Sequence, residues 1–238
     1  MRLDTIKNID PTNDSSWNDV AFLTFDIDWA SDEVLNYTVD ILEKNEVAAT
    51  FFVTHATPVL QRIRENPKFE LGIHPNFNFL LNGSFEKGQN IHEVLQGILE
   101  IVPEAKSVRS HSMTQNSHIL EAFKLSGLTH DANHFISVIA EIDLKPWLLW
   151  NGLVRCPYFW EDDVHYTEKD EYSVDQLLSR NGLKIFDFHP IHVYLNTESA
   201  YRYEKSRAVH RNFSELNQHR YKGYATENIL LELIERSK

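Results

Sequence analysis

One stretch near the start of the chain limits the fold more than any other. Residues 21–26 read Ala-Phe-Leu-Thr-Phe-Asp, and Asp28 follows Asp26 at the second position. Such an apolar and β-branched run is typical of a strand that is buried on both faces, as strands of parallel sheets are. Buried carboxylates are costly unless they are paired or bind a cation, and parallel α/β folds hold their ligands at the carboxyl ends of strands. Asp26 and Asp28 are therefore candidates for a metal or acid–base site, unless they only cap a helix or pair with a buried arginine.

Strand-like and helical segments alternate along the rest of the chain. Ser31 is a candidate N-cap for the first helix, and Pro58 is placed to start the second. The alternation predicts the α/β class, either a barrel or a doubly wound sheet. The predicted strands span residues 21–26, 48–53, 70–73, 106–109, 128–131 and 183–188, with an additional candidate at 147–150. The predicted helices span residues 32–45, 58–65, 91–102, 116–126, 173–181 and 226–236.

Polar residues end most of these strands, and this favours a barrel. In a barrel they converge on one rim, whereas an open sheet gathers its site at a single switch point. We therefore predict one distorted (β/α)7-type barrel domain over residues 21–238, preceded by an irregular N-terminal arm at residues 1–20. The strand-end residues are Asp26, Asp28, His55, His74, Arg109, Asp131, Glu161, Asp162, Asp163 and His189.

Composition excludes several classes of function. The formal net charge of −12, without a basic run, argues against a nucleic-acid partner or an anionic membrane surface. Cys156 is the only cysteine of the 238 residues, so no disulfide forms within the chain. The sequence has no run of 18 apolar residues, and residues 1–20 lack an apolar signal segment. We therefore expect a cytoplasmic protein without membrane insertion.

Two further groups of residues carry candidate chemistry. His74 and Asn78 are spaced i, i+4 and reach one ion if the chain turns helically after Pro75, although Asn78 also suits a turn. His189 ends the last strong strand and suits proton transfer near neutral pH, unless it only bonds Asp187 within the core. His192 is the competing candidate for that role. Arg109 is expected to pair with an acid among residues 161–163, either to orient a catalytic Asp or as a plain structural ion pair.

The motifs together resemble the polysaccharide deacetylase superfamily, the chitin-deacetylase-like carbohydrate esterases with the NodB-homology fold. The resemblance extends over about residues 20–192, and residues 24–28 are similar to the first family motif, Thr-Phe-Asp-Asp-Gly, with one added residue. Residues 49–53, Ala-Thr-Phe-Phe-Val, match the second strand literally. Residues 72–78 take the place of the His-x-x-x-His metal motif, and residues 109–112 that of Arg-x-Pro-Tyr. Residues 160–163 and 186–190 resemble the Asp/Trp motif and the strand of the catalytic His.

The resemblance implies a role for each matching position. Asp28, His74 and Asn78 would hold a divalent ion, with Zn²⁺ expected first and Co²⁺, Mn²⁺ or Ni²⁺ as alternatives. Asp26 would be the general base and His189 the general acid. Arg109, with an acid such as Asp163, would tune the base. The sequence departs from the family pattern at Asn78, which replaces a histidine ligand and shifts preference towards harder ions, and after Arg109, where Pro and Tyr are missing.

The implied activity is metal-dependent removal of an acetyl group from an N-acetylated sugar or sugar precursor, in surface-polysaccharide synthesis. The expected partner is accordingly a carbohydrate or another small molecule. A hydrolase of a different non-peptide C–N bond is a variant of this hypothesis. The alternative from another class is a catalytically inactive sugar-binding barrel, in which the metal site has been lost at Asn78.

Overall fold

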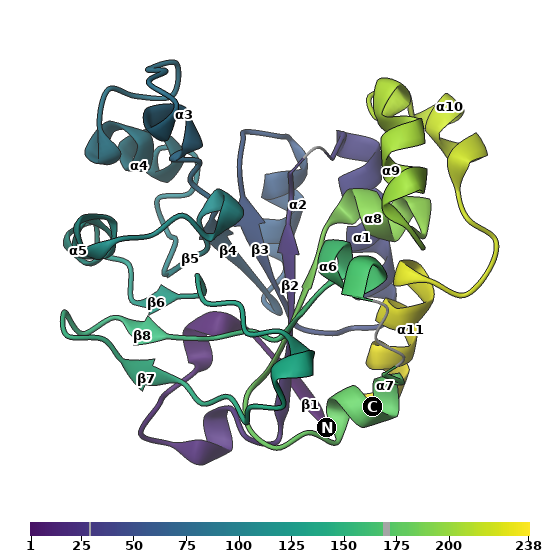
Figure 1. The fold of residues 1–238 in the computed structure, drawn as a ribbon, viewed down its shortest axis with the longest axis horizontal. Helices are drawn as coiled ribbons and strands as arrows, with labels where there is room; N and C mark the ends of the chain where they lie inside the picture. The colour runs from purple at the N-terminus through teal and green to yellow at the C-terminus, as the bar shows by residue number, and fades with distance from the viewer. Residues whose placement is uncertain (29, 169–171) are drawn as a thin grey trace.

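A curled, mostly parallel sheet forms the centre of the computed structural model, which describes residues 1–28, 30–168 and 172–238 (Figure 1). Its strands follow the order β7-β8-β6-β5-β4-β3-β2-β10-β9, and only the β7–β8 pair on this path is antiparallel. The predicted α/β barrel class is confirmed, with the sheet curled into a half-barrel. The strands are β2 (Val20–Asp26), β3 (Ala49–Val53), β4 (Phe69–Ile73), β5 (Ser107–Val108), β6 (His130–Asp131), β7 (Trp147–Leu148), β8 (Val154–Arg155), β9 (Trp160–Glu161) and β10 (Lys184–Phe188).

The four longest of these strands, β2, β3, β4 and β10, are buried along their whole length. Phe25 in β2 stacks on Phe51 in β3 and on Phe188 in β10, with ring centroids 5.3 and 5.7 Å away. These residues are also register partners across the strands, so the ring contacts follow the backbone pairing. Burial of large aromatic side chains is among the strongest stabilising contributions in a core. The residues that follow these strands therefore start from a rigid support.

Helices follow most strands and surround the sheet (Figure 1). The hydroxyl of Ser31 accepts a hydrogen bond from the backbone N–H of Val34, which confirms the predicted N-cap. The last helix coincides with its predicted range, whereas α4 and α7 end earlier than predicted. The helices are α1 (Asp32–Lys44), α2 (Val59–Glu65), α3 (Asn78–Leu81), α4 (Ile91–Leu99), α5 (Ser117–Leu125), α6 (Asp162–Glu168), α7 (Val174–Leu178), α8 (Pro190–Leu195), α9 (Ala200–Ser206), α10 (Phe213–Leu216) and α11 (Thr226–Arg236).

The N-terminal segment is more ordered than the irregular arm that we predicted. Its strand β1 (Arg2–Asp4) pairs in parallel with Val20–Phe22 of β2. This pairing ends before Thr24, the residue at which β2 begins to pair with β3. The chain then crosses the amino-terminal ends of the strands. The backbone N–H of Ile6 bonds the hydroxyl of Thr50 at 3.0 Å, and that of Lys7 bonds the carboxylate of Glu70 at 3.0 Å. These bonds satisfy polar groups that are buried under the sheet.

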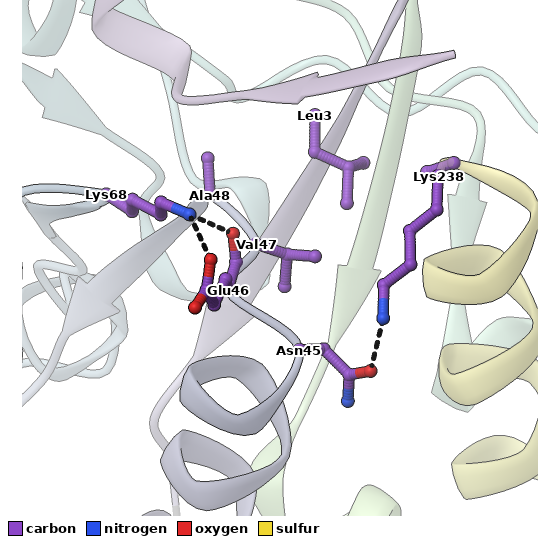
Figure 2. A pocket seen from close by; sticks show the side chains of 8 residues that line it. Leu3, Asn45, Glu46, Val47, Ala48, Lys68 and Lys238 are labelled. Atoms are coloured by element: carbon purple, nitrogen blue, oxygen red, sulfur yellow. Dashed lines mark hydrogen bonds and ion pairs between the residues drawn. The ribbon is translucent and has the colours of Figure 1, made fainter.

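Both chain termini lie at this same end of the strands (Figure 1). A cavity of about 320 Å³ lies there, between β1, the turn after α1 and the end of α11. Figure 2 shows the side chains that line it. The ammonium of Lys238 donates to the side-chain oxygen of Asn45 at 2.9 Å, and that of Lys68 donates to the carbonyl of Glu46. These contacts close the amino-terminal end of the sheet. Within the described residues, no helix is both long enough and apolar enough to cross a bilayer.

Candidate metal and acid–base site

The carboxyl ends of the central strands surround one cavity of about 280 Å³. Strands β2, β4, β5, β9 and β10 each supply residues to its wall, directly or through the loop that follows. Of the residues predicted for the site, all but Asn78 line this cavity. The lining residues among those predicted are Asp26, Asp28, His74, Arg109, Asp163 and His189.

Three side chains on one side of the cavity could share a metal ion. Nε2 of His74 lies 3.0 Å from Oδ2 of Asp28, and Nδ1 of His111 lies 3.0 Å from the same oxygen. The two imidazole nitrogens are 3.4 Å apart. Burial raises the pKa of Asp28, but the charge of His74 and hydrogen bonds from both histidines outweigh burial and leave the pKa below its ordinary value. The carboxylate is therefore in the ionised form that a metal requires.

This group fits a divalent ion by its chemistry and its dimensions. Two imidazole nitrogens and one carboxylate oxygen are a known ligand set of catalytic zinc sites, which keep a further position open. Bonds of about 2.0–2.2 Å in tetrahedral geometry place ligand atoms roughly 3.3–3.6 Å apart. The separations of 3.0, 3.0 and 3.4 Å are close to that range. Asp28, His74 and His111 are thus the residues that could hold the ion.

Asn78 lies beside this group and is engaged elsewhere. Its side-chain oxygen accepts a hydrogen bond from the hydroxyl of Thr114 at 2.9 Å, and its amide nitrogen donates to the hydroxyl of Ser112 at 3.1 Å. Ser112 lies within the short turn η3 (His111–Met113), which carries His111, and Thr114 directly follows this turn. The structure does not bring Asn78 to the metal group as predicted, because both ends of its amide brace this turn.

The turn has an unusual backbone. Ser112 and Met113 both have left-handed conformations, with φ of 55° and 51°. Such a conformation is uncommon for residues other than glycine and persists only where surrounding contacts enforce it. The backbone N–H of His111 supplies one such contact, because it bonds the carbonyl of Pro75 at 3.0 Å. The bonds from Asn78 supply two more, so the imidazole of His111 is held in a defined place.

Arg109 joins two carboxylates beneath the cavity. Its Nη1 atom donates to Oδ1 of Asp26 and to the hydroxyl of Thr24, each at 3.0 Å, and also to Oδ1 of Asp187. We predicted that an acid among residues 161–163 would pair with Arg109, but Asp26 and Asp187 do so instead. The register explains this choice, because Asp187 in β10 is the direct neighbour of Thr24 in β2.

The environment of Arg109 keeps it charged. The guanidinium lies between the rings of Phe52 and Tyr158, 4.5 and 4.4 Å from their centroids. Burial lowers the pKa of Arg109, but Asp187 and Asp26 raise it further, so the net shift is upward. Burial raises the pKa of Asp187, against the opposing effect of Arg109. Asp26 thus has a permanent positive neighbour at one oxygen.

Asp26 also contacts the metal group. Its Oδ2 atom lies 3.3 Å from Nδ1 of His74, an ion-pair distance without hydrogen-bond geometry. The other nitrogen of that ring points to Asp28. A carboxylate behind a metal-binding histidine commonly fixes the tautomer and the orientation of the ring. Asp26 is therefore placed both beside the candidate ion and behind one of its ligands.

His189 also lines the cavity and lies against Asp162. Its Nδ1 atom is 2.8 Å from Oδ1 of Asp162, and its backbone N–H donates to Oδ2 of the same carboxylate at 2.8 Å. Burial lowers the pKa of His189, but the charge of Asp162 and its hydrogen bond outweigh burial and raise it well above the ordinary value. The buried partner is thus Asp162, whereas the alternative that we had considered was Asp187.

His192, the competing candidate for proton transfer, does not reach the metal group. His192 is buried behind His189, with ring centroids 5.6 Å apart, and its Nδ1 atom bonds the hydroxyl of Thr197 at 3.0 Å. Burial and the neighbouring charges of His189 and His210 lower the pKa of His192 well below its ordinary value, so this ring is neutral. By contrast, a ring nitrogen of His189 lies within 4.8 Å of carboxylate oxygens of Asp26 and Asp187.

Asp163 lies next to His189 and away from Arg109. One oxygen from each of Asp163 and Glu161 lies within 4.8 Å of a ring nitrogen of His189. Glu161 accepts a hydrogen bond from the hydroxyl of Tyr158 at 3.1 Å, and burial raises its pKa well above the ordinary value. Asp163 therefore acts electrostatically on the acid side of the cavity, where we had predicted that it would tune the base.

Sequence reasoning missed two residues of this site. His111 follows a strand of only two residues, and it stands where the family motif leads one to expect Pro and Tyr. A broader rule, by which every histidine that follows a strand end is a candidate ligand, could have found His111. Asp162 was within the acidic trio, but no local pattern separates it from Asp163.

Comparison with known proteins agrees with this fold. Residues 23–207 match the family model described as WbmS-like, polysaccharide deacetylase. A candidate polysaccharide deacetylase of Bordetella bronchiseptica, WbmS, involved in O-antigen biosynthesis, is 43% identical and superposes with a TM-score of 0.93 over 100% of this chain and 98% of its own. No curated protein matches the sequence.

Two more distant structures are similar in part. A candidate polysaccharide deacetylase of Mycobacterium smegmatis is 17% identical, with a TM-score of 0.49 over 91% of this chain and 89% of its own. A family 4 carbohydrate esterase of Streptomyces lividans, solved with acetate, is 14% identical, with a TM-score of 0.42 over 71% and 78%.

The curled α/β sheet and the strand-end cavity are those of a polysaccharide deacetylase fold. The chain belongs to the WbmS-like polysaccharide deacetylase family. Family membership supports hydrolytic deacetylation of a carbohydrate as the general reaction.

Proposed function

We propose that this protein is a metal-dependent hydrolase that removes an acetyl group from an N-acetylated sugar within a surface polysaccharide or its precursor. One observation carries the proposal. One cavity is lined by the three metal-donor residues, by the Asp26 carboxylate that Arg109 holds, and by the His189 imidazole that Asp162 holds. Amide cleavage needs this combination, because water must be deprotonated and the amine must be protonated as it leaves.

The metal would be held by Asp28, His74 and His111, with Zn²⁺ the best match to two imidazoles and one carboxylate. Co²⁺, Mn²⁺ and Ni²⁺ remain alternatives for the same donors. When bound, such an ion supplies polarisation of the acetyl carbonyl and lowers the pKa of water at the site. His111 replaces Asn78 as the proposed third ligand, since the amide of Asn78 is bonded to Ser112 and Thr114.

Asp26 is the proposed general base. Its Oδ1 atom accepts a hydrogen bond from Arg109, which fixes the orientation of the carboxylate. Its position next to His74 puts it within reach of a water between the cavity and the metal group. Arg109 thus orients the base, while Asp187 in turn accepts a hydrogen bond from Arg109.

His189 is the proposed general acid. Asp162 raises its pKa, so the ring carries a proton at neutral pH and can donate it from the nitrogen that does not bond Asp162. The ring lines the same cavity as Asp26 and the metal group, which suits a substrate amide that meets base and acid in one site. Asp163 adds negative charge beside it, and this also favours the protonated ring.

The proposal is tested by acetate release with defined metal content. The purified chain is stripped with a chelator, reloaded with Zn²⁺, Co²⁺, Mn²⁺ or Ni²⁺, and given N-acetylglucosamine oligosaccharides and an O-antigen polysaccharide that contains N-acetylated sugars. The O-antigen substrate is chosen because the WbmS relative is described as involved in O-antigen biosynthesis. We expect acetate only from the metal-loaded protein. His189→Ala should keep the metal and lose about 10²–10⁴-fold in turnover.

Three outcomes would contradict the proposal. Glycan binding without acetate release at any metal loading would favour the inactive sugar-binding barrel. Release of ammonia or of another acid would identify a different C–N bond as the target. Acetate release that is unchanged by chelation would exclude the role of the ion.

A further inference from the structure

A second, larger groove opens beside the cavity described above. Its volume is about 750 Å³, within the usual range for ligand sites. Asp28 and His74 line both hollows, so the groove is continuous with the metal group. Its walls come from segments that lie apart in sequence: the α3–α4 region on one side and the α9–α10 region on the other, on opposite sides of the sheet end in Figure 1.

The groove carries two cations in an acidic molecule. Lys87 lies in the loop before α4, and Arg211 lies between η5 (Arg207–Val209) and α10; both are exposed and both line the groove. Neither makes a hydrogen bond or an ion pair with the residues that the structure describes. Glu86 is the acid that opposes them, so the groove has a net positive balance once Asp28 binds its ion. The whole chain, by comparison, has a net charge of −12.

The floor of the groove is apolar and open. It is formed by one face of α4, with Val94 and Ile98, and by Phe79. Gly97 lies in the middle of this face, and a Cβ atom added there would meet nothing within 4 Å. Glycine in a helix interior costs about 1 kcal/mol relative to alanine, so the sequence gives up stability at the position where a side chain would enter the groove. Sugar rings present C–H faces that suit such a floor.

We infer that this groove binds the sugar next to the one that is deacetylated, and that this neighbouring sugar carries a carboxylate. The inference rests on the proposed deacetylase function for the acetyl group, and it adds the acidic character of the glycan. Because Asp28 and His74 line both hollows, one glycan can extend from the reacting sugar in the cavity into the groove. Lys87 and Arg211 provide the complementary charge from the two walls, and the guanidinium of Arg211 matches a carboxylate in geometry.

Binding measured without turnover tests the inference. Calorimetry is performed with Zn²⁺ on the full chain carrying His189→Ala, with a disaccharide of N-acetylglucosamine and glucuronate, its counterpart with glucose, and UDP-N-acetylglucosamine. We expect the acidic disaccharide to bind about 5-fold or more tightly than the neutral one. Lys87→Gln and Arg211→Gln should each reduce that preference by about 2- to 5-fold, as should raised salt, without affecting the neutral ligand. Lys44→Gln, at the far end of α1, is the matched control.

A pair of substitutions at one position tests the location. Gly97→Leu places a side chain in the groove and should weaken both disaccharides by about 10-fold or more, whereas Gly97→Ala should leave both affinities unchanged. Circular dichroism and melting curves confirm that each variant is folded. Equal affinity for the acidic and neutral disaccharides, lack of binding by both, or tighter binding of UDP-N-acetylglucosamine than of the acidic disaccharide overturns the inference. Acidic preference that depends on Lys87 and Arg211, with no acetate released by the unsubstituted protein, would instead refute the deacetylase function and keep the groove.

Discussion

At the scale of single residues, the site depends on partners that fix each reactive group. Arg109 holds Asp26, Asp162 holds His189, and Asn78 holds the turn that carries His111. Each partner is at least partly buried, so its contact is little screened by solvent. Substitution of a partner should therefore alter the chemistry of its group without removing that group.

The first prediction compares the proposed ligand His111 with Asn78, which holds the turn of His111 in place. His111→Ala should weaken Zn²⁺ binding by more than about 100-fold, whereas Asn78→Ala, which frees the turn but keeps all three donors, should weaken it by about 10-fold to 100-fold. Calorimetric titration of the metal-free protein measures both, with Asn82→Ala after α3 as the control. The reverse order of effects would restore Asn78 as the third ligand.

The second prediction concerns pH. A raised pKa keeps His189 protonated below that pKa, so activity should fall as pH rises through it. Asp162→Asn removes the anion that raises this pKa, and the alkaline limb of the kcat/KM profile should move to lower pH. Asp175→Asn, an exposed acid in α7, should leave the limb in place. If Asp162→Asn lowers activity equally at every pH, Asp162 has only a structural role.

At the scale of elements, the long buried strands position the site, and the short turns after them complete it. Helix α1 begins at Asp32, shortly after Asp28, and the hydroxyl of Ser31 caps its first turn. The loop and the helix start thus share one small segment of chain. Loss of the cap should affect stability more than chemistry.

The third prediction tests this cap. Ser31→Ala should lower the free energy of unfolding by about 1 kcal/mol, because the N–H of Val34 loses its acceptor. Urea unfolding measures the change, with Ser126→Ala, an exposed serine after α5, as the control. Equal stability of the two variants would show that solvent replaces the cap without cost.

Sequence patterns predicted the elements with strong local signals and failed where tertiary contacts decide. The apolar run of β2 and the periodic face of α11 were sufficient for their ranges. The two-residue strand β7 falls within the additional candidate at residues 147–150, whereas β8 carries no such signal, since pairing with its neighbours defines it. In the site, Asp26, Asp28, His74 and His189 were recognisable because they directly follow long buried strands. His111 depends on a left-handed turn braced from another segment, and the partner of Arg109 was set by strand register, which no local pattern encodes.

At the scale of the whole molecule, the N-terminal segment forms part of the sheet, although we had predicted an arm outside the barrel domain. Strand β1 pairs with β2, and the following residues bond Thr50 and Glu70 beneath the sheet. His130 contacts the carbonyl of Ile9 at 2.9 Å, on the other half of the sheet. We therefore propose that residues 1–20 form part of the barrel domain.

The fourth prediction follows from this arrangement. Removal of residues 1–9 should destabilise the fold by about 2–5 kcal/mol, because the carboxylate of Glu70 is buried and loses the N–H of Lys7. Chemical denaturation of the shortened and full chains gives the difference. Glu70→Gln in the shortened chain should recover part of it, since a neutral amide is cheaper to bury than a carboxylate when only the hydroxyls of Thr50 and Ser107 remain as partners. An unchanged midpoint after the removal would identify the segment as a detachable arm.

The cavity in Figure 2 has a practical consequence for handling the protein. Leu3 and Lys238 line it together, at the end of the strands opposite the metal group, so the two chain ends are neighbours in space. A tether attached to either end should hold the protein on a bead or an electrode with its glycan-binding side facing the solution. A short peptide between the two ends would also permit new termini to be opened in a surface loop, yielding a circularly permuted protein with the same catalytic edge.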